Sequence, residues 1–428
     1  MPDPLRLGIA GLGTVGAGVV RIVQDHADRL TARTGRPITI SAVCARDRAK
    51  DRGVDLSAYG WEDDPVALAR RDDVDLFVEL MGGTDGPAKA ATEAALAAAK
   101  PVVTANKAML AVHGHALAEA AEGAGVALRY EAAVAGGIPC IKALGEGLAA
   151  NAVTRVMGVM NGTCNYILTR MGDAGLPYET VFEEARALGY LEADPTLDVG
   201  GIDAGHKLSI LAALAFGQRV DFGGVALQGI ERVSIDDIRR ADDMGYRIKL
   251  LGVARVTRDG VEQSMRPTLV PAASPLGQLE GATNMVVLEG DAVGQIVLRG
   301  AGAGAGPTAS AVMADVCDVA RGSGGPVFGQ PAATLDAPRR AEAASPCAHY
   351  LRLSLRDEPG ALARVATVLG RADISIDRMR QYDHPGGDAP VLIVTHPCAP
   401  GALATALTGL EETGVVTEPP VAFQIQDV

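Results

Sequence analysis

The chain has 428 residues, of which 48% are hydrophobic and 21% are charged, and its formal net charge is −13. That length accommodates two or three domains, and the composition excludes a largely disordered chain. An acidic chain without basic clusters disfavours nucleic acids and anionic membranes as partners. The six cysteines are scattered without a CxxC pair, which argues against a zinc ribbon or a disulfide framework. We find neither a signal-peptide pattern nor an apolar run that would span a bilayer, so we expect a cytoplasmic protein without a membrane partner.

The N-terminal part alternates between predicted strands and predicted helices. Strands are expected at residues 5–10, 38–44, 74–80, 101–104 and 127–130. Helices are expected after the glycine-rich turn at 11–16, at 88–99 and at 115–122. Such alternation predicts a doubly wound parallel sheet with helices on both faces. We therefore expect an α/β, Rossmann-type NAD(P)-binding domain over residues 1–135.

The pattern changes beyond this domain. We expect a central α+β domain over 136–300, with strands at 153–159, 250–256 and 285–298. A glycine run precedes a helix pattern, and we expect the segment 301–321 to complete the first domain. Residues 322–347 are rich in glycine, proline and alanine and are predicted to form a linker.

The tail over residues 348–428 has a rhythm of its own. Strands are predicted at 351–355, 374–381, 391–396 and 422–425, and helices at 361–370 and 402–410. This βαββαβ order is typical of a small α+β sandwich.

The first turn carries a complete GxGxxG motif between a predicted strand and a predicted helix. Its residues are Gly11, Leu12, Gly13, Thr14, Val15 and Gly16. In this context the first glycine permits the tight turn, the second lets the backbone approach a pyrophosphate, and the third allows close packing of helix on strand. The helix N-terminus adds a favourable dipole for a phosphate. An ordinary tight turn between strand and helix is the alternative.

The second strand ends without an obvious acid for a ribose hydroxyl. Arg46 stands at the expected position, with Lys50 nearby. A guanidinium suits a 2′-phosphate, so we favour NADP over NAD. Because Asp47 is an acid next to Arg46, NAD remains the alternative cofactor. The alternative for Arg46 itself is a solvated loop residue that binds no cofactor.

A run of four carboxylates ends in a lysine at residues 189–207. A helix predicted from about Gly201 to Phe216 makes Asp203 and Lys207 neighbours on one face. The helix is almost wholly apolar beyond Lys207, which indicates burial. A buried lysine beside carboxylates is a candidate functional group, and a plain helix salt bridge is the alternative.

Several motifs, taken in order, resemble the homoserine dehydrogenase family over essentially the whole chain. They are GLGTVG at 11–16, TANK at 104–107, YEAAVAGGIP at 130–139, NGTCNYIL at 161–168, GYLEADPTLDVGGIDAGHK at 189–207 and GAGAGAGPTASAVMADV at 301–316. The resemblance implies reversible, NAD(P)H-dependent reduction of L-aspartate 4-semialdehyde to L-homoserine.

The resemblance also implies site residues. Lys207 would transfer the proton, Lys107 would lie near the nicotinamide and the reacting oxygen, and Asp198 would orient substrate or lysine. Glu192 would bind the ammonium group of the substrate, next to Asp203. Thr104 flanks Lys107 on the cofactor side, at the end of a sheet strand.

A monovalent cation site is implied as well. It would involve the Glu131 side chain and the backbone carbonyls of Val134, Gly136 and Ile138. An oxygen cage of that kind suits sodium or potassium.

The tail resembles the ACT regulatory domain, whose match here includes Asp357, Gly360 and Ile374. Such domains pair between subunits and bind small amino acids, so the resemblance implies feedback inhibition by threonine and a homodimer or homotetramer. A module used only for dimerisation is the alternative.

Two other functions are alternatives to a homoserine dehydrogenase. An aspartate semialdehyde dehydrogenase would need a nucleophilic cysteine with a nearby histidine, and no fitting arrangement appears. A non-catalytic amino-acid sensor is disfavoured because Lys107, Glu192, Asp198 and Lys207 are all present.

Overall fold

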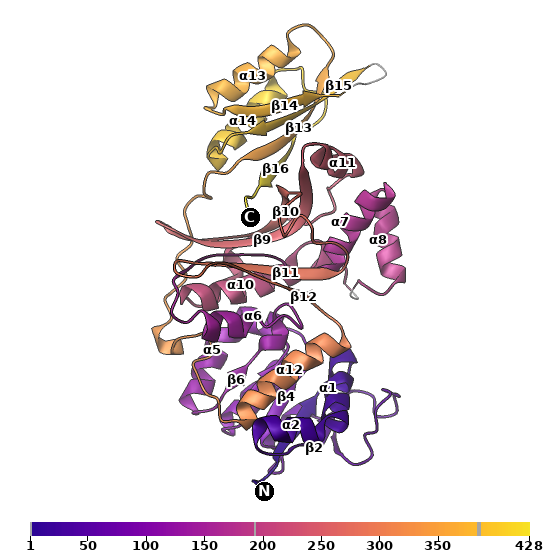
Figure 1. The fold of residues 1–428 in the computed structure, drawn as a ribbon, viewed down its shortest axis with the longest axis vertical. Coiled ribbons are helices and arrows are strands. Elements are labelled where there is room, and N and C mark those ends of the chain that lie inside the picture. The colour runs from indigo at the N-terminus through magenta and orange to yellow at the C-terminus, as the bar shows by residue number, and fades with distance from the viewer. Residues whose placement is uncertain (1, 192–193, 383–386) are drawn as a thin grey trace.

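The computed structural model describes residues 2–191, 194–382 and 387–428, so Glu192 lies outside the described residues. In Figure 1 the N-terminal unit lies at the bottom, a broad sheet crosses the middle, and the C-terminal unit stands at the top. Within the described part, none of the helices is both long and apolar enough to cross a membrane.

The N-terminal unit is built on a six-stranded parallel sheet with the order β3-β2-β1-β4-β5-β6. Its strands are β1 Leu5–Ala10, β2 Ile38–Cys44, β3 Gly60–Glu62, β4 Leu76–Glu79, β5 Val102–Thr104 and β6 Leu128–Arg129. This order is that of dinucleotide-binding folds, whose ligands lie beyond the carboxyl ends of the strands where the order reverses. The predicted doubly wound sheet is confirmed, and the short β3 was not predicted.

Helices cover both faces of this sheet. They are α1 Thr14–Asp25, α2 Ala27–Thr34, α3 Pro65–Arg70, α4 Pro87–Ala97, α5 Lys107–Gly123 and, from far along the chain, α12 Ala305–Ala320. The last packs on α1, where Gly18 lets the backbone of Ala305 approach closely. This helix comes from the 301–321 segment, whose assignment to the first domain stays a prediction.

Helix α5 begins well before the predicted 115–122 segment. The Asn106 side chain accepts a hydrogen bond from the backbone amide of Met109 and so caps the helix at its first turn. The prediction placed the start too late because it followed the apolar pattern and overlooked this cap.

A second, mixed sheet forms the centre of the molecule. Its strands in the central region are β7 Val153–Val159, β8 Val225–Leu227, β9 Tyr246–Thr257, β10 Gly260–Pro271, β11 Thr283–Gly290 and β12 Gly294–Ala301. The helices beside it are α6 Cys140–Lys142, α7 Gly162–Ala174, α8 Tyr178–Ala187, α9 Thr196–Val199, α10 Ile202–Phe216 and α11 Ile235–Asp243. The α+β character predicted for this region is confirmed.

One strand prediction in this region needs correction, and one long strand was not predicted. The single strand expected at 285–298 is a hairpin, β11 and β12, because Gly294 adopts a φ of 72° at the turn. Strand β10 was missed because Pro267, which has no amide hydrogen, lies in its middle. The proline is tolerated because β8 pairs with residues 263–265 and β16 with 268–269, which leaves Pro267 between the two pairings.

The C-terminal unit has the predicted βαββαβ order. Its elements are β13 His349–Arg356, α13 Ala361–Arg371, β14 Ile376–Gln381, β15 Asp388–Thr395, α14 Pro400–Glu412 and β16 Val421–Ile425. Strand β16 runs parallel to β10 and joins this unit to the central sheet, giving ten strands in all. The C-terminal unit and the central region therefore share one continuous sheet.

The segment predicted as a linker, 322–347, packs along the molecule. Phe328 is buried against Tyr130, whose hydroxyl donates to the carbonyl of Val327 at 2.8 Å. Further on, Arg340 forms an ion pair of 2.7 Å with Asp221. The glycine and proline content thus marks an irregular segment that is held in place by its contacts.

Candidate active site

The turn between β1 and α1 leaves open space where a cofactor phosphate would approach. A Cβ atom on Gly11 would meet the carbonyl oxygen of Leu80 at 2.4 Å, and one on Gly16 would meet the carbonyl oxygen of Gly11 at 2.0 Å. A Cβ atom on Gly13 would meet nothing within 4 Å. Gly11 and Gly16 therefore lie where a side chain would collide with backbone, and Gly13 faces open space. Thr14 is exposed beside that open space, whereas the Leu12 side chain is buried in the core.

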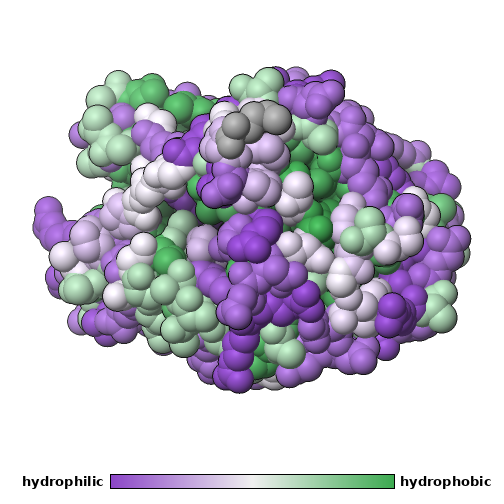
Figure 2. Space-filling view, turned by 90° about the horizontal axis from the view of Figure 1, so that it is seen from below, coloured by the Kyte–Doolittle hydropathy of each residue, from purple (hydrophilic) through white to green (hydrophobic). Residues whose placement is uncertain are grey.

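Two cavities meet at this end of the sheet. The first, which we call the turn cavity, has a volume of about 870 Å³ and is lined by Gly11–Gly13 and by Arg46 and Lys50. The second, the reaction cavity, has a volume of about 590 Å³ and contains Lys107, Asp203 and Lys207. Both share the wall formed by residues 80–82. Figure 2 views the molecule from this lower end and shows hydrophobic residues in a recess of a largely hydrophilic face.

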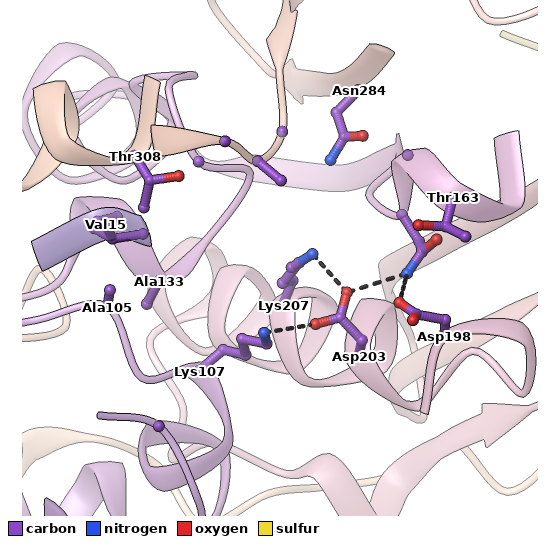
Figure 3. A pocket seen from close by; sticks show the side chains of 18 of the residues that line it. Val15, Ala105, Lys107, Ala133, Thr163, Asp198, Asp203, Lys207, Asn284 and Thr308 are labelled. Atoms are coloured by element: carbon purple, nitrogen blue, oxygen red, sulfur yellow. Dashed lines mark hydrogen bonds and ion pairs between the residues drawn. The ribbon is translucent and has the colours of Figure 1, made fainter. Parts of the chain in front are cut away.

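Two lysines from different helices converge on one carboxylate in the reaction cavity (Figure 3). The Lys207 ammonium lies 2.6 Å from one oxygen of Asp203, and the Lys107 ammonium lies 2.9 Å from the other. Lys207 also donates to the carbonyl of Met160 at 2.8 Å. Because Asp203 binds a lysine from a second helix, this arrangement is more than a salt bridge within one helix.

Burial and charge act in opposite directions on Asp203, which is 6% exposed. Burial favours the neutral acid, but the ammonium groups of Lys207 and Lys107 hold the pKa of Asp203 well below its ordinary value. The carboxylate is therefore ionised and fixes both lysines at the cavity wall. The neighbouring His206 lies with its ring against Phe222, at 4.2 Å between centroids.

Asn161 connects this cluster to a second buried acid. Its side-chain nitrogen donates to Asp198 at 2.9 Å and to Asp203 at 3.3 Å, and its oxygen accepts from the backbone amide of Cys164. The residue thereby caps α7 and orients two carboxylates at once. The NGTCNYIL motif contains Asn161, but the sequence reading gave it no role, because only the folded chain brings it to Asp198 and Asp203.

Other predicted residues lie at different depths around the cavities. Val15 lines the reaction cavity, while Arg46 and Lys50 are exposed and line the turn cavity. Thr104 is fully buried and lines neither cavity; its hydroxyl donates to Glu79 at 2.6 Å. Thr104 also accepts from the backbone amide of Asn106, so its contacts hold the segment that presents Lys107. Asn284 and Thr308, which were not predicted, line the reaction cavity.

The predicted cation-site residues belong to one buried turn after β6. Glu131, Val134 and Ile138 are all at most 2% exposed. The Glu131 carboxylate accepts from the backbone amides of Ile141 and Lys142, each at 2.9 Å. Burial raises the pKa of Glu131 to about 7, and Asp315 adds to this shift.

The three predicted effector residues do not share one environment. Gly360 precedes α13 with a φ of 85°, and Asp357 is exposed on the same loop. Ile374, by contrast, is buried in the core of the C-terminal unit.

Comparison with known proteins agrees with this architecture. Residues 11–131 match the homoserine dehydrogenase NAD-binding domain, residues 139–317 match the homoserine dehydrogenase family, and residues 349–414 match the ACT domain. A homoserine dehydrogenase of Neisseria gonorrhoeae is 41% identical over 99% of both chains, and that of Bacillus subtilis is 37% identical over 99% of this chain and 98% of its own.

Solved structures give the same result. A homoserine dehydrogenase from Thiobacillus denitrificans is 39% identical and superposes with a TM-score of 0.93, covering 99% of this chain and 98% of its own. The homoserine dehydrogenase of Staphylococcus aureus is 31% identical, with a TM-score of 0.77 over the full length of both chains. The chain therefore belongs to the homoserine dehydrogenase family of oxidoreductases, with a nicotinamide-cofactor domain at its start and an ACT domain at its end.

Proposed function

We propose that the chain oxidises L-homoserine to L-aspartate 4-semialdehyde, and catalyses the reverse reduction, with Lys207, Lys107, Asp198 and Asp203 as its site residues. The convergence of Lys107 and Lys207 on Asp203, beside the glycine turn, carries this proposal. A bound nicotinamide cofactor would take the hydride from the carbon that bears the hydroxyl group.

The proton is assigned to Lys207. In the oxidative direction its neutral amine takes the proton of the substrate hydroxyl, and in the reductive direction its ammonium returns it. Lys107 supplies positive charge to the developing alkoxide. Because Lys207 must be neutral to act as a base, we expect homoserine oxidation to rise with pH.

Substrate positioning is assigned to the acids around the lysines. Asp198, held by Asn161, would orient substrate or Lys207, and Asp203 fixes both lysines. Glu192, which lies outside the described residues, is proposed from the family resemblance alone to bind the substrate ammonium group.

NADP is proposed as the cofactor, with NAD as the alternative. The open space at Gly13 suits a pyrophosphate, and Arg46 with Lys50 suits a 2′-phosphate at the far end of the turn cavity. Oxidation of homoserine, followed at 340 nm with NADP⁺ and NAD⁺ in parallel, tests both activity and preference. Turnover with either cofactor supports the proposal, and a folded protein that turns over neither contradicts it. Arg46→Ala is expected to weaken NADP⁺ use and leave NAD⁺ use little changed.

A sodium or potassium ion is proposed at the turn of Glu131, Val134, Gly136 and Ile138. The acids Glu131, Asp315 and Asp318 gather around Lys142, and a cation would offset their charge. The Glu131 carboxylate already accepts two backbone amides, so the carbonyl oxygens are the better ligands. Thermal melting in sodium, potassium and tetramethylammonium chloride tests the site, and a midpoint that is the same in all three contradicts it.

Feedback inhibition by threonine at the ACT domain is proposed, with the loop from Asp357 to Gly360 as the effector contact. The exposed start of α13 suits the carboxylate of an amino acid. Threonine titrated to millimolar concentration should reduce homoserine oxidation, and no effect would favour another effector or a purely structural domain. We also propose that the protein is a cytoplasmic homodimer or homotetramer. Its molar mass in solution, measured by light scattering, tests the oligomeric state.

A further inference from the structure

Two cysteines face one another where the C-terminal unit joins the rest of the chain. Cys347 precedes β13 and Cys398 follows β15. The amide of Cys347 donates to the carbonyl of Cys398 at 3.2 Å, and the reverse hydrogen bond measures 3.0 Å. In such a hydrogen-bonded antiparallel pair the Cα atoms lie about 5.5 Å apart. That spacing falls within the range of about 4.4–6.8 Å found across disulfide bonds.

One buried histidine contacts both thiols. His349 stands two positions after Cys347, so both side chains lie on one face of the strand. Its Nε2 atom is 3.6 Å from the Cys347 sulfur, and its Nδ1 atom is 3.5 Å from the Cys398 sulfur. Burial lowers the pKa of His349 to about 4, so the imidazole is neutral and can relay a proton without retaining it.

A cationic side chain, Arg266, lies nearby, and Glu262 is the acid that acts on its charge. Arg266 of β10 forms no ion pair with a described residue, and its buried Nε atom lacks a hydrogen-bond partner there. Burial raises the pKa of the Cys347 thiol to about 11; Cys398 and Glu262 add to this shift, and the charges of Arg255 and Arg266 oppose it. The guanidinium therefore favours the thiolate once the proton has left.

The arrangement does not suit a metal ion. The two sulfurs contact different nitrogens of the ring, so one ion could not bind both thiols and the imidazole together. No metal-binding group of three such side chains occurs in the described ranges. The feature that favours a bond between the two cysteines is the backbone bridge that sets them opposite one another.

We propose that Cys347 and Cys398 are a site of reversible oxidative modification and form an intramolecular disulfide when a hydroperoxide is present. Cys347 is the more exposed thiol and reacts first: its proton passes to His349, and its sulfur attacks the outer peroxide oxygen. The O–O bond breaks, giving a sulfenic acid and, after return of the proton, an alcohol or water. The Cys398 sulfur then attacks the sulfenic sulfur, and the S–O bond breaks with release of water. The peroxide is reduced by two electrons and the two thiols are oxidised.

The disulfide would link the segment just before β13 to the segment just after β15. Ser345, two residues before Cys347, donates to Glu262 of β10 from both its amide and its hydroxyl, at 3.1 and 2.9 Å. The disulfide therefore adds a covalent link beside the contacts that join the two sheets, and the oxidised protein should melt at a higher temperature than the reduced one.

Peptide mapping of the full-length protein tests the proposal. Trypsin places Cys347 in the peptide 341–352 and Cys398 in 381–428, and each holds a single cysteine. After hydrogen peroxide, alkylation and non-reducing digestion, we expect these two peptides joined with loss of two hydrogens, and separated again by dithiothreitol. Free thiols should fall from six to four.

Variants separate this site from general oxidation. Cys347→Ser and Cys398→Ser should each abolish the joined peptide, and the matched Cys317→Ser should retain it. His349→Asn should slow its formation about tenfold or more. Sulfinic or sulfonic acid at Cys347 without joining, joining through other cysteines, or six unchanged thiols in peroxide-treated wild-type protein would each overturn the proposal.

Discussion

At the scale of single residues, the site depends on one carboxylate that holds two ammonium groups. Asp203 lies within 2.9 Å of both lysines, and neither lysine needs to move to reach it. Such fixed charges stabilise a developing alkoxide better than mobile water, because they need no reorientation during the reaction.

Replacing Lys207 tests the assigned proton transfer. Lys207→Ala should lower turnover by about 10²–10⁴-fold, since positioned acid–base catalysis contributes on that order. Cofactor affinity should change little, because Lys107 remains paired with Asp203. Steady-state kinetics and cofactor titration measure both effects, with Lys89→Ala, a surface lysine paired to Glu93, as the control. Near-normal turnover would remove Lys207 from the role.

A buried lysine outside the candidate site, Lys249, makes the stability of the protein depend on pH. Lys249 is 4% exposed and donates to Asn165 at 3.1 Å and to the carbonyl of Leu279. Burial lowers its pKa to about 8, whereas an unfolded lysine titrates near about 10.4. Between these values the unfolded chain binds more protons, so this residue makes the free energy of unfolding increase with pH, by up to about 3 kcal/mol.

Urea denaturation at pH 7.5 and pH 10 measures this contribution. Lys249→Met should remove part of the increase with pH that the wild type shows, whatever its effect on absolute stability. Lys89→Met, on the surface, should leave the increase unchanged. An identical pH dependence in Lys249→Met and wild type would contradict the assignment.

At the scale of elements, two glycines of the β1–α1 turn are expected to have different roles, Gly16 in packing and Gly13 in cofactor binding. A Cβ atom at position 16 would collide with the carbonyl oxygen of Gly11, whereas position 13 faces open space. Gly16→Ala should therefore lower the melting temperature. Gly13→Ala should leave it within a few degrees of wild type and raise the KM for the cofactor, because the methyl group occupies the space left for a phosphate. Melting curves and kinetics of the two variants give opposite patterns, and equal stability losses would contradict this division.

At the scale of the whole molecule, the ACT domain contacts the centre through α11 as well as through β16. Arg352 of β13 pairs with the fully buried Asp237 at 2.6 Å, and Asp237 also caps α11 through Ser234. Helix α11 packs against α7, whose first turn is capped by Asn161 at the reaction cavity. A continuous series of packed elements thus connects the two units.

Removing the Arg352 contact should weaken this connection. If threonine inhibits the wild type as proposed, Arg352→Met should raise the half-inhibitory concentration about 5-fold or more, because typical coupling between sites is about 1–3 kcal/mol. Uninhibited turnover should stay close to wild type. Arg186→Met, which breaks a surface pair with Glu183, is the control. Unchanged inhibition in a stably folded Arg352→Met would show that this contact does not couple the two units.

The sequence alone determined what nearby residues encode. The GxGxxG turn, the strand and helix order of the first and last units, and the Asp203–Lys207 pair depend on short spacings, and the structure has them as predicted. The family resemblance rested on the same short motifs, each of which can be read along the chain.

The tertiary structure alone decided which distant segments meet. Lys107 and Asn161 reach Asp203 only after the two sheets have packed, and β10 pairs around Pro267 only because two other strands flank it. Thr104 stands beside Lys107 in sequence, yet its hydroxyl is buried against Glu79. Periodicity reports the face of one element, whereas these contacts depend on how elements far apart in the chain close on one another, and no local spacing records that.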